Sequence, residues 1–84
     1  MENVQSLKIL NDYCLALTFS TNEVKVFDCK PYLEKGIFKS LKAASKFNQA
    51  YIDYGTVCWP NGLDISPASL YDKSYQYASV KFLI

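Results

Sequence analysis

The stretch VQSLKILNDYCLALTFSTNEVKVFD, residues 4–28, decides the fold of this chain. Its apolar side chains recur at every second position, which is the period of a β-strand with one buried face. Asn11–Asp12 and Thr21–Asn22 interrupt the alternation with residues that favour turns. The pattern predicts a meander of three antiparallel strands over residues 4–10, 14–19 and 23–28.

The second of these segments is apolar on both faces, with Leu15, Leu17 and Phe19 on one side and Cys14, Ala16 and Thr18 on the other. A strand covered on both faces lies inside a sheet, so we expect it to be the central strand. The segment 23–28 alternates polar and apolar residues, which predicts a half-exposed strand.

Two helices are expected after the meander. Pro31 has no N–H to donate and ends the ladder, and residues 31–35 suit a helical turn before Gly36. At 100° per residue, four apolar side chains of the segment 37–47 share one face: Ile37, Leu41, Ala44 and Phe47. We therefore expect a main helix over 37–47 that packs on the sheet. Ser66–Pro67 is typical of a helix start and predicts a short second helix over 68–72.

The segment 51–59 contains either two short strands or one strand interrupted at Gly55 by a bulge, and both interpretations stay open. A turn is expected at 59–62. Residues 75–84 alternate again and predict a strand-like C-terminal extension, which either pairs with its own sheet or joins two protomers in a homodimer. The prediction is a single α+β domain, residues 1–84, in which a small antiparallel β-sheet packs against one main helix and a short second helix.

Composition narrows the class of protein. The chain has 84 residues, half of them apolar, which is enough for one core. It has no apolar run of about 18 residues and no leader pattern at its start, so we expect a cytoplasmic protein with no membrane contact. Three separated cysteines without a CxxC spacing, and no histidine, favour buried, inert thiols over a disulfide framework or a metal site.

Charge and residue types argue against catalysis and against cofactors. The net charge is +1, so no strong electrostatic field attracts nucleic acid. All nine basic residues are lysines, so the guanidinium group that binds phosphates and guanine edges at two points is absent. Without histidine the usual base is absent, and Asp53, Asp64 and Asp72 are more typical of turns and caps. The three glycines are too far apart to cradle a phosphate. We expect no enzyme activity and no cofactor.

Two groups of residues are candidates for binding. Lys39, Lys42 and Lys46 gather opposite the apolar face of the predicted helix, where they form either a docking surface or an ordinary solvated face. Trp59, Tyr51 and Tyr54 form either a recognition surface or part of a small core. Asn61 and Asp64 are expected in an exposed polar patch next to Trp59.

The phrase Gly55-Thr56-Val57-Cys58-Trp59-Pro60-Asn61-Gly62-Leu63-Asp64-Ile65, with Leu70-Tyr71 after it, resembles the bacterial domain-of-unknown-function family 2442. The resemblance extends over residues 4 to 71 and implies no reaction. It does imply a genetic context, because some members are encoded beside a small protein of family 4160 in an arrangement similar to a toxin–antitoxin pair. Some longer relatives append a helix-turn-helix domain, but here only a short predicted strand follows Tyr71.

We therefore expect a small non-enzymatic protein-interaction module, one partner of a bacterial two-protein pair. The contact surface would be a sheet edge or the Trp59–Asp64 loop. The alternative is a DNA-binding or regulatory accessory protein that acts through the lysine-bearing helix. Binding that weakens steeply with salt would favour the alternative.

Overall fold

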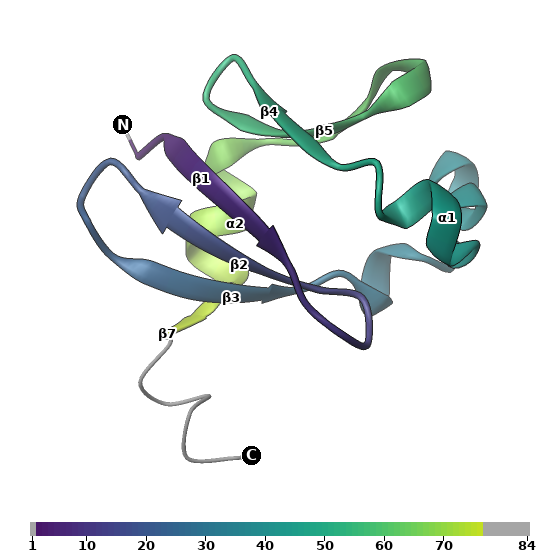
Figure 1. Cartoon of the computed structure of the whole chain (residues 1–84), viewed down its shortest axis with the longest axis horizontal. Helices are drawn as coiled ribbons and strands as arrows, with labels where there is room; N and C mark the ends of the chain where they lie inside the picture. The colour runs from purple at the N-terminus through teal and green to yellow at the C-terminus, as the bar shows by residue number, and fades with distance from the viewer. Residues whose placement is uncertain (1, 77–84) are drawn as a thin grey trace.

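The computed structural model describes residues 2–76, and the fold is α+β, as predicted (Figure 1). Sheet A is antiparallel with the order β1-β2-β3-β7, and sheet B is antiparallel with the order β4-β5-β6. The strands are β1 Val4–Ile9, β2 Cys14–Phe19, β3 Val24–Asp28, β4 Tyr51–Asp53, β5 Thr56–Trp59, β6 Leu63–Ile65 and β7 Tyr75–Gln76. The helical segments are η1 Lys30–Tyr32, η2 Gly36–Lys42, α1 Ala44–Phe47, η3 Pro60–Gly62 and α2 Pro67–Lys73, where η denotes a 3-10 helix.

The predicted meander is confirmed. Strand β2 lies between β1 and β3, and its side chains Leu15, Leu17 and Phe19 are completely buried. Leu17 pairs with Leu7 on β1 and with Lys25 on β3, so these three residues face the same side of the sheet. That side is the core side of sheet A.

Strand β3 differs from the predicted half-exposed strand. Lys25 lies on the core side and is 7% exposed, whereas Val24 is 39% exposed. The lysine is tolerated there because its Nζ donates a hydrogen bond of 2.6 Å to the carbonyl of Tyr71, in the last turn of α2. The same Nζ lies 3.9 Å from the centre of the Tyr71 ring, in cation–π geometry. The end of α2 therefore covers Lys25, which the alternating pattern of β3 had predicted to be exposed.

The prediction of one main helix over 37–47 was wrong. The chain forms η2 and α1 instead, separated at Ala43, whose φ of −71° and ψ of 116° are extended. Leu41 and Phe47 are buried as expected, but Ile37 is 70% exposed and Ala44 is exposed. The reason is the tighter winding of a 3-10 helix, which has three residues per turn and moves Ile37 off the face of Leu41.

Sheet B resolves the open interpretation of residues 51–59 in favour of two strands. Tyr54 and Gly55 join β4 to β5 with φ angles of 52° and 71°, which is the pattern of a two-residue type I′ hairpin turn. Strand β6 was not predicted, because three residues give too short an alternation. The predicted start of α2 is confirmed, since Ser66 Oγ accepts a 3.2 Å hydrogen bond from the N–H of Ser69.

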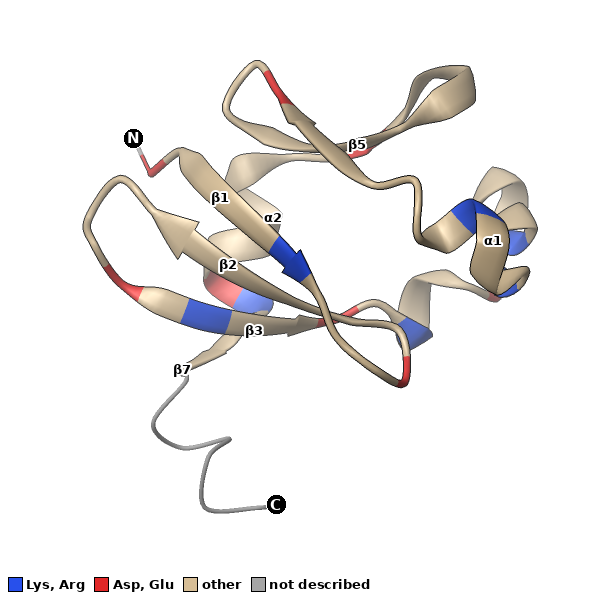
Figure 2. Ribbon diagram, in the orientation of Figure 1, with Lys and Arg blue, Asp and Glu red and all other residues tan. Residues whose placement is uncertain are grey.

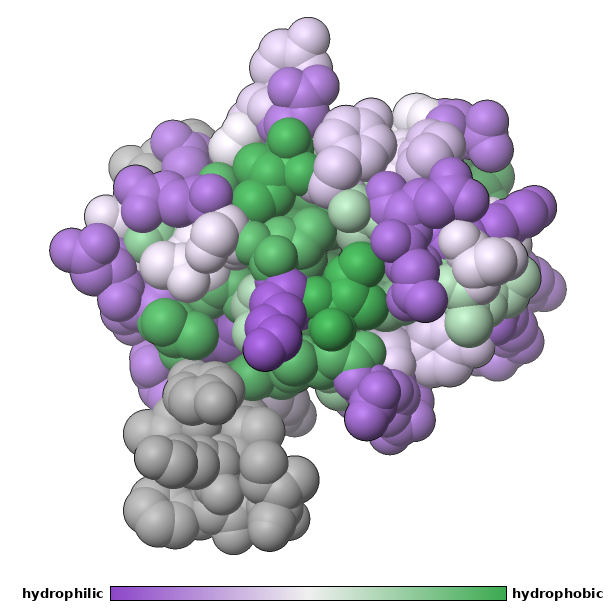
Figure 3. All heavy atoms as spheres, viewed as in Figure 1, coloured by the Kyte–Doolittle hydropathy of each residue, from purple (hydrophilic) through white to green (hydrophobic). Residues whose placement is uncertain are grey.

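One core lies between the two sheets, α2 and the η2–α1 segment. Its largest fully buried side chains come from both sheets and α2: Trp59, Phe19, Phe27, Leu15, Leu17, Leu70 and Val57. The N–H of Val4 donates a 2.8 Å hydrogen bond to the carbonyl of Gly55, which ties the start of sheet A to the hairpin of sheet B. Figure 3 shows the surface that faces the viewer in Figure 1: apolar residues lie across its middle, with a hydrophilic residue among them and polar residues around them.

The predicted C-terminal strand begins on its own sheet. Tyr75 and Gln76 pair with Val26 and Lys25 of β3. The remainder of the predicted extension, residues 77–84, lies outside the described residues, so the homodimer through this strand stays a prediction. Within residues 2–76, no helix has the length and apolar character needed to span a membrane.

Candidate interaction surface

Most residues of the phrase at 55–65 have a structural role in the hairpin and turns of sheet B. Gly55, Asn61 and Gly62 all have positive φ, between 71° and 77°. Val57, Leu63 and Ile65 point into the core. Thr56 is buried and its hydroxyl donates to the carbonyl of Ile65, which joins β5 to the end of β6. These residues build the sheet.

Trp59 is a core residue, so of the two interpretations left open for this side chain the structure favours a place in the small core over a recognition surface. It is 1% exposed, and its indole N–H donates a 2.9 Å hydrogen bond to the carbonyl of Phe47. That bond connects sheet B to the end of α1 and satisfies the polar atom of a buried indole.

Asn61 and Asp64 are both exposed, but they lie beside different hollows on either side of Trp59. Asn61 borders a hollow together with Ser40, Lys46 and Gln49. Asp64 borders the other hollow, together with residues of β4. The single polar patch expected around Trp59 is therefore divided in two.

The outer face of sheet B brings the tyrosines Tyr51 and Tyr54 together with two carboxylates. Tyr51 pairs with Cys58, which pairs with Asp64, so the three form a row across the sheet. Asp53 lies on the same side as Tyr51, two residues along β4, and Tyr54 follows at the hairpin turn. We call Tyr51, Asp53, Tyr54, Cys58 and Asp64 the acidic–aromatic face. It borders a shallow hollow completed by Trp59, Gly62 and Leu63.

Exposure and charge distinguish this face. Tyr54 is 92% exposed and Tyr51 is 45% exposed, so both are large aromatic surfaces open to solvent. Asp53 Oδ1 accepts a 3.0 Å hydrogen bond from the N–H of Tyr54. The carboxylate of Asp64 makes no hydrogen bond or ion pair with any described residue. Burial is the main cause that raises the pKa of the Cys58 thiol, and Asp64 and Asp53 raise it further.

The three candidate lysines do not form one helical face, because the break at Ala43 separates Lys39 and Lys42 on η2 from Lys46 on α1. All three are exposed. Lys42 Nζ lies 2.7 Å from Glu34 Oε1, which neutralises much of its charge locally. Figure 2 shows basic positions on α1 and on the helical segments near it, away from the acidic position on β4.

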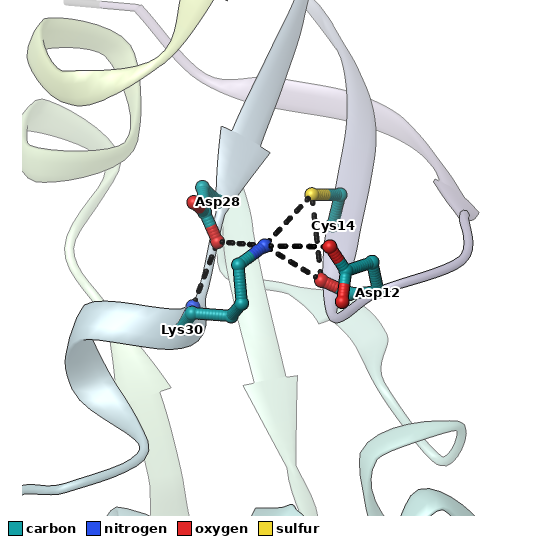
Figure 4. Close-up of polar contacts among 4 residues, drawn as sticks. All are labelled: Asp12, Cys14, Asp28 and Lys30. Atoms are coloured by element: carbon teal, nitrogen blue, oxygen red, sulfur yellow. Dashed lines mark hydrogen bonds and ion pairs between the residues drawn. The ribbon is translucent and has the colours of Figure 1, made fainter.

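A second polar cluster joins the β1–β2 turn to the end of β3 (Figure 4). We call Asp12, Cys14, Asp28 and Lys30 the lysine clasp. Lys30 Nζ lies 3.2 Å from Asp12 Oδ2 and 3.0 Å from Asp28 Oδ1, and it donates a 3.0 Å hydrogen bond to the carbonyl of Asp12. This cluster was not predicted from the sequence, because Asp12 and Lys30 are 18 positions apart and no local pattern links them.

The cysteines have the environment of unreactive thiols. Burial raises the pKa of Cys29 to about 12 and is also the main cause that raises the pKa of Cys14. A thiol with a raised pKa is a poor nucleophile at neutral pH. Cys29 and Cys58 are buried as predicted, whereas Cys14 is partly exposed beside Lys30. In the part of the chain that the structure describes, no cluster of three or more His, Cys, Asp or Glu side chains could hold a metal ion.

Comparison with known proteins gives one match. A family model described as protein of unknown function (DUF2442) matches residues 4–76. No curated protein and no solved structure shows significant similarity to the chain.

Proposed function

The chain belongs to the family of proteins of unknown function DUF2442, and from that premise we propose that it is a non-enzymatic module that binds another protein. The partner is a small companion protein, in a bacterial two-protein pair of the toxin–antitoxin kind. The contact surface is the acidic–aromatic face.

The observation that carries this proposal is the exposure of Tyr51 and Tyr54 beside Asp64. Aromatic side chains dominate the binding energy of protein interfaces, and tyrosine combines a large apolar ring with a polar tip. Asp64 has no partner among residues 2–76, whereas its neighbours on β6, Leu63 and Ile65, are buried and build the core. A side chain with no evident role in the fold, next to exposed aromatic rings, supports binding as its role.

The environments of the reactive side chains support a non-enzymatic role. Asp53 and Asp64 lie on an open sheet face rather than in an enclosed site, and the thiols of Cys29 and Cys58 are buried with raised pKa values. General acid–base catalysis depends on a group positioned against a bound substrate with a pKa near the working pH.

The proposal is tested by co-expressing the chain with the small companion protein that we expect to be encoded beside it, and by measuring the mass of the purified species by light scattering. We expect a stable complex that the variant Tyr54→Ala/Asp64→Lys disrupts. The matched control is Lys39→Glu/Lys46→Glu, which changes the other candidate surface and should leave the complex intact.

A complex that survives the first variant and is lost in the second would contradict the proposal and favour the lysine surface. Salt separates the two further. Binding to nucleic acid through Lys39 and Lys46 would weaken steeply between low and moderate salt, whereas a contact in which tyrosine rings contribute most and one or two ion pairs contribute little should weaken only slightly. The absence of any complex with the companion would count against the module itself.

A further inference from the structure

The acidic–aromatic face has the shape of a short trough. Tyr51 and Asp64 stand at the two ends of a cross-strand row, and Cys58 between them is a short side chain that is only 9% exposed. Two strand spacings separate the ends by about 10 Å. The short side chain of Cys58 in the middle of the row forms the apolar floor of a hollow that opens to solvent.

The walls of this trough carry one sign of charge. Asp53 and Asp64 contribute two carboxylates, and no lysine of residues 2–76 borders the hollow, although the chain as a whole has a net charge of +1. Tyr51 and Tyr54 add two exposed rings, whose faces attract cations. Carboxylates around an apolar floor, with aromatic faces beside them, match a side chain that has an aliphatic stem and a cationic head.

We propose that this trough receives a lysine or arginine side chain from a basic segment of the partner protein. The inference rests on the proposed function and specifies the chemistry of the partner. The stem would lie over Cys58, and the cationic head would lie near the carboxylates and against a tyrosine ring. A second copy of this chain, which offers Lys39 and Lys46, is the competing occupant.

The experiment uses the full chain, labelled with nitrogen-15, and the probe peptide acetyl-Gly-Arg-Gly-Arg-Gly-amide at low ionic strength. We expect amide shifts confined to residues 51–54, 58 and 62–64, and weak affinity that decreases as salt is added. The peptide in which both arginines are replaced by glutamine should produce no such shifts.

The decisive variant is Asp53→Asn/Asp64→Asn. It should fold normally, because asparagine keeps the oxygen that accepts from the Tyr54 N–H and because Asp64 has no partner among the described residues. We expect the affinity for the arginine peptide to fall about three- to tenfold, as for the loss of two exposed ion pairs. The matched control is Asp72→Asn, an exposed carboxylate on α2, which should leave the affinity unchanged.

Shifts spread over the whole surface, equal shifts with the glutamine peptide, or an equal loss of affinity in Asp72→Asn would overturn the proposal. A mass that doubles with concentration and returns to monomer in Asp53→Asn/Asp64→Asn would replace the partner by a second copy. If the companion complex forms and is unaffected by Asp53→Asn/Asp64→Asn, the proposal that the trough receives a cationic side chain is wrong, while the proposal of an interaction module stands. If no companion complex forms, the module is wrong even where the peptide binds.

Discussion

The lysine clasp and the acidic–aromatic face each contain two carboxylates, but only the clasp contains the cation that balances them. Asp12 and Asp28 both lie within 3.2 Å of Lys30 Nζ. Asp53 and Asp64 have no ion pair among residues 2–76, and they lie beside two exposed tyrosine rings instead. The carboxylates of the lysine clasp are therefore paired within the chain, whereas those of the acidic–aromatic face are available to a partner.

This difference separates structural charges from charges available to a partner. A carboxylate paired within the chain joins two elements of the fold, as Asp12 and Asp28 join the β1–β2 turn to the end of β3. A carboxylate left in solvent beside apolar surface contributes little to folding, but it can select the charge of whatever binds there. The two regions should therefore respond differently to mutation.

The largest expected effect is Trp59→Ala, which removes the support beneath the acidic–aromatic face and leaves the lysine clasp untouched. We expect a loss of about 3–5 kcal/mol in the free energy of unfolding, because a fully buried indole is replaced by a cavity. Urea denaturation followed by circular dichroism measures it. The control Trp59→Phe keeps most of the packing and loses the hydrogen bond to the Phe47 carbonyl, for about 1 kcal/mol. A loss below 1 kcal/mol in Trp59→Ala would mean that this residue is not a core anchor.

Gly55→Ala should strain the hairpin that presents Tyr54. The φ of Gly55 is 71°, a conformation that costs alanine about 1–2 kcal/mol. An added Cβ would also lie 2.9 Å from Asn3 Oδ1, although that exposed side chain can move away. We expect a destabilisation of about 1–2 kcal/mol by urea denaturation. The double variant Asn3→Ala/Gly55→Ala should be destabilised almost as much, since the backbone strain remains. A full recovery there would assign the effect to the side-chain contact.

Alternation along the chain was sufficient to predict sheet A and the α+β class, because its period reports directly which face of a strand is buried. It failed where tertiary contacts override local pattern. Lys25 is buried because the end of α2 supplies a carbonyl and a ring, and neither can be read from β3 alone. The 37–47 segment was expected to be one helix, and its apolar spacing could not reveal the extended backbone at Ala43.

The candidate surface was predicted in part. Asp64 was expected to be exposed, and Tyr51 and Tyr54 were considered for recognition, but nothing local joined them. The strand register places these residues side by side, because Cys58 pairs with both Tyr51 and Asp64. The clasp was missed for the same reason. Residues that meet through strand pairing, rather than through neighbouring positions, leave no short motif in a single sequence.

A third carboxylate, Glu23, is hydrogen-bonded within the chain like those of the lysine clasp, and it makes the stability of the fold depend on pH. The Tyr71 hydroxyl donates to Glu23 Oε1, and hydrogen bonds from Tyr71, Gln76 and Thr21 lower the Glu23 pKa to about 2. The bond to Glu23 is also the main cause that raises the Tyr71 pKa to about 12. Because the Glu23 pKa is lower in the folded state than in the unfolded state, this carboxylate stabilises the fold at pH values above about 4.5. The contribution is lost as pH falls from about 4.5 to about 2.

The raised Tyr71 pKa has the opposite sign, so its contribution is present below pH 10 and is lost as pH rises from 10 to about 12. We expect Glu23→Gln to flatten both limbs of the stability profile, measured by urea denaturation at a series of pH values. Asp64→Asn is the control, because Asp64 makes no hydrogen bond or ion pair with any described residue and is not among the groups that shift the pKa of Glu23 or Tyr71. An acid limb that stays equally steep in Glu23→Gln would show that other carboxylates produce it.

The smallest effect is also the most direct comparison of the two regions, made with the same substitution in each. Asp28→Ala removes the 3.0 Å ion pair with Lys30 and the 2.9 Å hydrogen bond from the Lys30 N–H at the start of η1, so we expect a loss of about 1 kcal/mol in unfolding free energy. Asp64→Ala removes a carboxylate without a partner in residues 2–76, and stability should stay within about 0.5 kcal/mol. Binding should show the reverse order, with Asp64→Ala weakening the companion complex and Asp28→Ala leaving it unchanged. Equal losses of stability at the two positions would mean that Asp64 supports the fold, and the acidic–aromatic face would then lose its distinction from the clasp.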